Sequence, residues 1–313
     1  MPSGADTWRP TTKKARLGAI KRFGFIYLLL APAVLYYIVF RYYPMAMQAM
    51  LAFKDFSLLG GVWGSPWVGL DQFHALFAKP DFGQVVRNTI WISLLRIGFG
   101  FFPPIILAIF LFDLRFRLLR TFSQMILYIP HFFSWVIVYA IIYAVFTNNG
   151  LANHAIEWLG GAPQDFLMAP EWFRTLLVGS AIWKEIGWGT IIYLAGLTTL
   201  DSSLFDAAKM DGAGPWRRIW HITLPGIRPV IVFLFTLSLG HILYAGGEQV
   251  LLFYNPATME VGDIIDTWVY RQGLTQLQYS LASAMSLFQS VFGLCLVVVA
   301  NALARKYSGA GIW

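Results

Sequence analysis

Residues 89–112 read TIWISLLRIGFGFFPPIILAIFLF, a stretch whose only charged side chain is Arg96. A helix needs about 20 mostly apolar residues to cross the roughly 30 Å hydrocarbon core of a membrane. The stretch therefore predicts a transmembrane helix. Pro103 and Pro104 lie within it, and they predict a kink at that point because proline cannot donate a backbone hydrogen bond.

Comparable apolar stretches elsewhere in the chain predict an all-α integral membrane protein with six transmembrane helices. Its composition agrees, because 58% of the residues are hydrophobic and 12% are charged, against about 25% charged residues in soluble domains. The single cysteine, Cys295, excludes a disulfide framework and a cysteine-based zinc site. The predicted spans are Phe23–Tyr43, Thr89–Phe112, Met125–Phe146, Leu176–Leu200, Val230–Gly247 and Ser280–Ala304.

The distribution of Lys and Arg predicts that both termini are cytoplasmic, since cytoplasmic segments of membrane proteins are enriched in these residues. The basic segments are residues 1–22, the loops after the second and fourth spans, and the tail. The net charge of +7 therefore reflects membrane topology rather than nucleic-acid binding. The predicted parts are a basic cytoplasmic segment 1–22, a transmembrane domain 23–304, a cytoplasmic loop 201–229, extracytoplasmic loops 44–88, 147–175 and 248–279, and a cytoplasmic tail 305–313.

The N-terminal apolar run has a second interpretation as a cleaved signal peptide, because Ala31-Pro32-Ala33 resembles a small-residue cleavage site. The run continues past that site to Phe40, which favours a retained helix.

Several kinds of catalytic and metal site are absent from the sequence. It contains no Gly-Lys pair, so it has no phosphate-binding loop of the P-loop type. It also lacks an HExxH motif, and its histidines show no metal-ligand spacing. We therefore predict no catalytic residues, no metal site and no cofactor on this chain.

The predicted cytoplasmic loop contains the most specific pattern, DAAKMDGAGPWRRIWHITLP at residues 206–225. Asp201 and the serines after it are favourable N-cap residues for a short helix. Gly212 and Gly214 are expected to end that helix, because glycine tolerates the left-handed conformation. A second short helix is expected from Pro215. The loop is therefore predicted to form an exposed surface to which a partner protein can dock.

This loop resembles the signature of permease subunits of binding-protein-dependent ABC importers: Glu-Ala-Ala, three residues, Gly, nine residues, then Ile-x-Leu-Pro. Asp206 stands where the family usually has Glu. The resemblance implies a type I ABC-importer fold with a cytoplasmic coupling helix that contacts an ATPase. The implied coupling residues are Asp206, Ala207, Ala208, Asp211, Gly212, Ile222, Leu224 and Pro225.

Other segments resemble the branch of these permeases that transports sugars and complex polysaccharides, including alginate oligosaccharides. They are residues 68–73, VGLDQF, and the segment from Tyr254 to Arg271. The resemblance implies an inner-membrane complex of this chain, a paralogous permease and two ATP-binding subunits, which would hold ATP and Mg²⁺. An extracytoplasmic solute-binding protein would deliver the oligosaccharide.

Polar and aromatic side chains in the predicted spans are candidates for the substrate pathway, since such groups are costly in a membrane. For Trp and Tyr the alternative is a place in the interfacial aromatic belt. The candidates are Arg96, His131, Trp135, Tyr139, Lys184, Trp188, His241, Tyr244 and Glu248.

The cations among these candidates favour an acidic cargo. One alternative is that Lys184 pairs with Glu185 or with a neighbouring helix. Adjacent residues on a helix point about 100° apart, however, so Glu185 is expected to be a poor partner for Lys184. The unmet charge of Lys184 would then attract an anionic saccharide. Arg96 is the weaker candidate, because it is expected near the start of its span, where it could snorkel or pair with another helix.

Aromatic and charged residues of the outer loops are candidates for docking the binding protein. They are Trp63, Trp67, Tyr254, Glu260, Asp263 and Arg271. Three other functions remain open: a permease for a neutral sugar, an ion-coupled secondary carrier, and a membrane enzyme acting on glycans. A carrier would need acidic groups within the membrane, and Glu185 is the clearest one.

Overall fold

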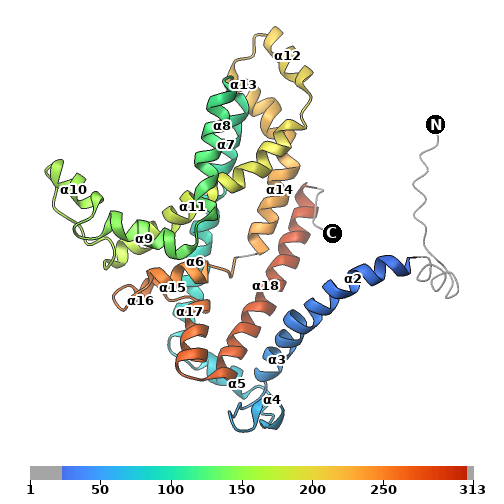
Figure 1. Cartoon of the computed structure of the whole chain (residues 1–313), viewed down its shortest axis with the longest axis vertical. Helices are drawn as coiled ribbons and strands as arrows, with labels where there is room; N and C mark the ends of the chain where they lie inside the picture. The colour runs from blue at the N-terminus through green and yellow to red at the C-terminus, as the bar shows by residue number, and fades with distance from the viewer. Residues whose placement is uncertain (1–22, 241, 309–313) are drawn as a thin grey trace.

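The computed structural model describes residues 23–240 and 242–308, and within these ranges the chain is helical apart from loops and one isolated bridge (Figure 1). The elements, in order, are α2 (Gly24–Tyr37), η1 (Ile38–Tyr42), α3 (Tyr43–Leu51), α4 (Gly61–Gly64), α5 (Asp71–Phe77), α6 (Phe82–Gly100), α7 (Phe102–Asp113), α8 (Arg117–Tyr128), η2 (Ile129–Phe132), α9 (Trp135–Phe146), α10 (Leu151–Trp158), α11 (Pro170–Thr198), α12 (Ser202–Met210), α13 (Pro215–Arg218), η3 (Ile219–Thr223), α14 (Leu224–Gly240), α15 (Gly247–Phe253), α16 (Met259–Gly262), α17 (Ile265–Tyr270), η4 (Arg271–Thr275) and α18 (Tyr279–Ser308).

Five helical segments of the described chain are long and apolar enough to cross a membrane. They are Gly24–Leu51, Phe82–Asp113, Trp135–Trp158, Pro215–Leu239 and Tyr279–Ala302. The predicted fourth span lies in α11, an unbroken helix of 29 residues, which is about 43 Å long. It falls outside the five because of its composition rather than its length, so the count of six spans stays a prediction.

The helical hydrogen-bond pattern of the second span is interrupted where the prolines predict a kink, because α6 ends at Gly100 and α7 begins at Phe102. The prolines remove the backbone donors that would continue the α6 hydrogen-bond pattern.

The third predicted span, Met125–Phe146, is wrong as a single helix. The helix α8 ends at Tyr128, the 3-10 turn η2 contains Pro130, and α9 begins at Trp135. Pro130 lacks the N–H that would continue α8. Ser134 then caps α9, because its hydroxyl accepts a hydrogen bond from the Ile137 N–H at 3.4 Å.

The fifth predicted span, Val230–Gly247, also has the wrong boundaries. Helix begins at Pro215, passes through the π-helical η3 and continues as α14 to Gly240. The described residues 242–246 are not helical, and α15 starts a new helix at Gly247. The second short helix expected from Pro215 is present as α13, and it continues through η3 into α14.

The helix α11 lies at the centre of the bundle and packs against α6, α7, α8 and α14 (Figure 1). Its Tyr193 and Leu197 are buried with Ile105 and Leu111 of α7. Glycine permits two close approaches: Gly189 packs on the ring of Pro104, and Gly187 on the carbonyl of Leu127. Small residues of this kind let membrane helices approach closely.

The N-terminal helices have a different environment. No residue of α2 is buried, and the helix points away from the bundle in Figure 1, while α3 reaches α18. The bundle has two ends, which we name by their short helices. The α12 end carries α12 and α13, and the α5 end carries α4, α5 and α17 (Figure 1).

The first prediction concerns the packing of α11. Gly187→Ala should lower the thermal unfolding temperature of the purified protein, because the added methyl group would overlap the Leu127 carbonyl. Gly179→Ala is the matched control, since this exposed glycine of the same helix has no neighbour that a methyl group would meet. An equal unfolding temperature for the two variants would show that α8 and α11 are not in close contact.

Candidate functional site

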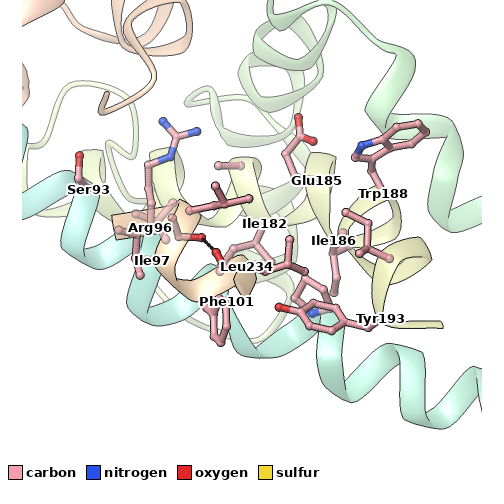
Figure 2. A pocket seen from close by; sticks show the side chains of 18 of the residues that line it. Ser93, Arg96, Ile97, Phe101, Ile182, Glu185, Ile186, Trp188, Tyr193 and Leu234 are labelled. Carbon is pink, nitrogen blue, oxygen red and sulfur yellow. Dashed lines mark hydrogen bonds between the residues drawn. The ribbon is translucent and has the colours of Figure 1, made fainter. Parts of the chain in front are cut away.

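A cavity of about 900 Å³ lies between α6, α7, α11 and α14 (Figure 2). This volume is within the range of pockets that hold small organic ligands. Its lining comprises Ser93, Arg96, Ile97, Gly100, Phe101, Pro104, Val178, Ala181, Ile182, Glu185, Ile186, Trp188, Gly189, Ile192, Tyr193, Leu234, Leu237, Ser238 and Tyr244.

The charged groups of the cavity, Arg96 and Glu185, lie on one side. Figure 2 shows Ser93, Arg96 and Glu185 pointing to the same side, with Phe101 and Tyr193 at the opposite side of the view. The cavity is thus a mainly apolar space with a charged region at one side, where a ligand's ionic groups would be placed.

Arg96 lies further along its helix than the sequence predicted. The helical segment runs from Phe82 to Asp113, which places Arg96 about midway along it rather than near its start. Its Nη1 donates a hydrogen bond to the Ala245 carbonyl, in the non-helical turn before α15. A guanidinium has several further N–H donors, so this bond leaves part of the group able to bind a ligand.

Ser93 lies one helical turn before Arg96 and was not predicted. Its side chain is 2% exposed, lines the cavity, and its Oγ has no hydrogen-bond partner among the described residues. A buried hydroxyl without a partner is costly. The spacing of three residues from Arg96 on one helical face was the signal that could have identified it.

The prediction that Lys184 lacks a protein partner is wrong. Its Nζ lies 3.2 Å from Glu185 Oε1 and donates to the His131 carbonyl at 2.7 Å. The ammonium also lies 5.3 Å from the centre of the Trp135 ring. Both side chains are long enough to meet although their Cβ atoms diverge, so Lys184 is buried and satisfied outside the cavity lining.

His131 lies behind the cavity wall. Its Nδ1 is 2.8 Å from Glu185 Oε2, and its ring stacks on Trp188 with centroids 4.4 Å apart and planes at 3°. Trp188 and Glu185 line the cavity, whereas His131 does not. The predicted residues His131, Trp135, Lys184 and Trp188 are therefore brought together, as a cluster that joins η2 and α9 to α11.

The remaining pathway candidates lie apart. Tyr139 packs against Phe253 with ring centroids 5.1 Å apart, within another apolar cluster. His241 is outside the described residues. Tyr244 lines the main cavity, whereas Glu248 lines a smaller hollow of about 320 Å³ together with Asp266 and Tyr270.

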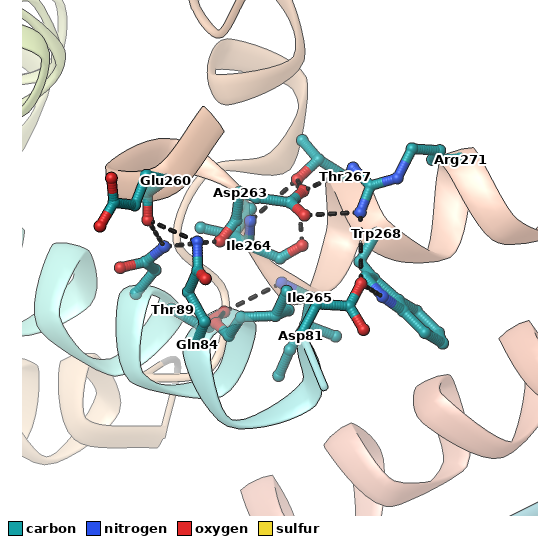
Figure 3. Close-up of polar contacts among 12 residues, drawn as sticks. Asp81, Gln84, Thr89, Glu260, Asp263, Ile264, Ile265, Thr267, Trp268 and Arg271 are labelled. Atoms are coloured by element: carbon teal, nitrogen blue, oxygen red, sulfur yellow. Dashed lines mark hydrogen bonds and ion pairs between the residues drawn. The ribbon is translucent and has the colours of Figure 1, made fainter. Parts of the chain in front are cut away.

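The docking candidates at the α5 end divide into two groups. Arg271 forms two hydrogen bonds with Asp263, at 3.0 and 2.6 Å, so these two residues satisfy each other (Figure 3). Trp63 and Trp67 are 69% and 63% exposed and remain open to a partner. Glu260 is exposed and Tyr254 half-buried.

The Asp263–Arg271 pair belongs to a wider network that fixes this end of the molecule. Trp268 Nε1 donates to Asp81 Oδ2 at 2.7 Å, and Asp81 lies 3.8 Å from Arg271. Gln84 and Asn88 of α6 both donate to the Glu260 carbonyl, at 2.8 and 2.9 Å. The network in Figure 3 therefore ties the start of α6 to α16 and α17.

The segment that carries the signature residues, 201–229, has much of the predicted local structure. Asp201 Oδ1 accepts a hydrogen bond from the Ser203 N–H at 2.9 Å and caps α12. Gly212 has a φ of +73°, and the Ala213 N–H donates to the Ala208 carbonyl at 2.8 Å, as in a Schellman motif. The expectation for Gly214 is wrong, because its φ of −65° makes it the N-cap of α13.

The signature residues lie at the α12 end. Asp206, Ala207, Asp211, Gly212 and Pro225 are exposed, whereas Ala208, Ile222 and Leu224 are half-buried. Asp206 Oδ1 accepts a hydrogen bond from Lys209 at 2.9 Å. Trp216 and Trp220 are also largely exposed, so this end has an accessible surface that is both apolar and charged.

Comparison with known proteins places the chain among transport proteins. Residues 100–309 match the family described as binding-protein-dependent transport system inner membrane component. The chain is 44% identical over 290 residues to the polygalacturonan/rhamnogalacturonan transport system permease protein YteP of Bacillus subtilis (strain 168), covering 92% of this chain and 90% of that protein.

Two crystal structures have the same fold along nearly the whole chain. One is of a bacterial ABC transporter involved in the import of the acidic polysaccharide alginate, with a TM-score of 0.86 and 37% identity over 93% of this chain and 99% of the other. The second is of a bacterial alginate ABC transporter in complex with alginate pentasaccharide-bound periplasmic protein, with a TM-score of 0.86 and 36% identity over 94% and 99%.

The second prediction tests the structural role of Lys184. Lys184→Met should lower the thermal unfolding temperature, because it leaves the His131 carbonyl without its donor, a loss of about 1–3 kcal/mol for a buried acceptor. Lys209→Met is the control, since Lys209 is exposed and pairs within α12. An unchanged unfolding temperature in Lys184→Met would contradict the structural role.

Proposed function

We propose an acidic oligosaccharide, held through Arg96, as the cargo of this chain, which belongs to the family of binding-protein-dependent transport system inner membrane components. The chain is a multi-pass inner-membrane protein with the type I ABC permease fold and is the permease subunit of an oligosaccharide importer. The observation that carries the proposal is the guanidinium with spare donors at the cavity, beside the unpartnered hydroxyl of Ser93.

The charge balance around the cavity supports this cargo. A cation at the centre of a membrane costs about 2.5–3.5 kcal/mol on insertion scales. Within the described part of the chain, the hydrogen-bond partner of Arg96 is a backbone carbonyl, that of Ala245. The carboxylate of Glu185 lines the same cavity and attracts Arg96, but it is also engaged by Lys184 and His131 and makes no hydrogen bond to the guanidinium. A uronate carboxylate can bind a guanidinium through two parallel hydrogen bonds, which a neutral sugar cannot do.

The aromatic lining fits the other part of such a cargo. Trp188 and Tyr244 line the cavity, and one face of Trp188 is covered by His131. Trp188 is 45% exposed, and this exposed ring surface could stack on the C–H face of a sugar ring. The names of similar proteins also support an acidic cargo. YteP is named for polygalacturonan, a polymer of uronic acid, and the similar transporter of known structure is involved in the import of the acidic polysaccharide alginate.

The same proposal includes the partners and the topology. A paralogous permease completes the transmembrane path, and two ATP-binding subunits hold ATP and Mg²⁺ and receive α12 at the cytoplasmic side. An extracytoplasmic binding protein docks at the α5 end, where Trp63 and Trp67 are exposed. The periplasmic protein in the related alginate transporter complex supports this last partner. Both termini lie in the cytoplasm.

The third prediction tests the cargo. In the complete importer reconstituted in proteoliposomes with its binding protein, Arg96→Met should slow uptake of an oligouronate by about tenfold or more, as expected for loss of a charged hydrogen bond. Uptake of the carboxyl-reduced, neutral oligosaccharide should change little. Each rate is divided by the wild-type rate for the same cargo, so the preference of the binding protein cancels. Equal effects on the two cargoes would refute the acidic cargo.

The fourth prediction tests coupling through α12. Gly212→Ala should reduce cargo-stimulated ATPase activity of the assembled importer, because a left-handed conformation costs a non-glycine residue roughly 1–2 kcal/mol. Gly214→Ala is a close control: this glycine lies two residues away, has an ordinary φ, and faces open space. Wild-type ATPase stimulation in Gly212→Ala would show that the turn does not contribute to coupling.

A further inference from the structure

The turn between α14 and α15 leaves backbone groups that no helix satisfies. The described residues 242–246 are non-helical, although they lie within the predicted fifth span, between α14 and α15. Non-helical backbone at membrane depth is tolerated where it is buried in protein or lines a cavity. Two side chains from other helices supply donors here. Gln289 Nε2 of α18 donates to the Leu243 carbonyl at 2.8 Å, and Arg96 donates to the Ala245 carbonyl.

Gln289 is itself held on a second side. Its side chain is buried, and the same Nε2 donates to Asp266 Oδ1 of α17 at 3.2 Å. Burial raises the pKa of the Asp266 carboxyl, and the hydrogen bond from Gln289 opposes that rise. The amide therefore links α17 to the turn, and it has little freedom to move away from the Leu243 carbonyl.

The turn comes very close to the guanidinium of Arg96. Gly246 has a φ of +85°, and a methyl group on this residue would overlap Arg96 Nη1. A shift of the turn would therefore move the Ala245 carbonyl that orients Arg96, or push the backbone into the guanidinium. The position of residues 243–246 and the orientation of Arg96 depend on each other.

We propose that Gln289 is a positioning residue for Arg96: by anchoring the Leu243 carbonyl, it fixes the turn that orients the guanidinium and thereby sets the preference for acidic cargo. This inference rests on the proposed function, because it assumes that Arg96 binds the carboxylate of the cargo. Gln289 does not line the cavity, so it acts through the turn and not by touching the cargo.

The test uses the complete importer in proteoliposomes, with binding protein loaded with either an oligouronate or its carboxyl-reduced form. Gln289→Met keeps the length of the side chain and removes its donors. It should lower the acidic-to-neutral uptake ratio, relative to wild type, by about fivefold or more, which corresponds to about one charged hydrogen bond weakened. Ser290→Ala is the control, because Ser290 is exposed and bonds only within α18, and its ratio should equal that of wild type.

A double-mutant cycle distinguishes positioning from a general structural role. In the Arg96→Met background, Gln289→Met should have no further effect on the ratio. An equal loss of both cargoes in Gln289→Met, with the ratio unchanged, would overturn the inference. If Gln289→Met fails to assemble, Asp266→Leu replaces it: this change removes the second anchor of Gln289 without exposing the Leu243 carbonyl, and it should lower the ratio in the same direction.

The Arg96→Met importer separates the two proposals. If that variant lowers the ratio while Gln289→Met and Asp266→Leu do not, the positioning role is refuted and the acidic cargo stands. If Arg96→Met leaves the ratio unchanged, the acidic cargo itself is refuted.

Discussion

Backbone carbonyls inside a membrane need hydrogen-bond donors from the protein, and the arrangement of this bundle depends on how three of them are satisfied. Lys184 donates to the His131 carbonyl at the break between α8 and α9. Gln289 and Arg96 donate to carbonyls of the turn between α14 and α15. In each case the donor comes from a different helix. The breaks therefore join helices to one another.

The same constraint gives the membrane cations different roles. Lys184 has a carbonyl, a carboxylate and an aromatic ring around its ammonium, so its charge is used within the bundle. Arg96 satisfies one carbonyl and still faces the cavity, beside a buried hydroxyl that has no partner in the described chain. Charge alone does not distinguish a structural cation from one that binds cargo. The two roles are distinguished by the number of side-chain N–H donors that remain after the backbone carbonyl is satisfied.

The sequence predicts the features that depend on local chemistry. Apolar length indicates most of the spans, the proline pair indicates the break before α7, and Asp201 and Gly212 indicate where α12 begins and ends. The position of Arg96 along its helix was misjudged because α6 begins at Phe82. The side-chain amides of Gln84 and Asn88, in the first turns of α6, donate hydrogen bonds to the Glu260 carbonyl, which is far away in the sequence.

The two unpredicted breaks have the same explanation. An apolar segment has the same composition whether it is helical or unwound, and the donors that permit unwinding lie on distant helices. Leu243 and Gln289 are separated by 46 residues, and His131 and Lys184 by 53. The pairing of Lys184 with Glu185 was missed for a different reason, because ideal helix geometry places Cβ atoms but not the ends of long side chains.

These breaks also bear on how an importer of this fold could change conformation. Unwinding a regular helix loses several backbone hydrogen bonds together, whereas moving a break changes only the few bonds that side chains supply. The deformable points of the bundle are thus those held by Lys184, Gln289 and Arg96. In the proposed importer, the cargo and the Ala245 carbonyl share one guanidinium. By linkage, any difference in cargo affinity between two conformations of the turn must equally shift the balance between those conformations. An acidic cargo can therefore bias the turn from within the cavity, through the residue that binds it.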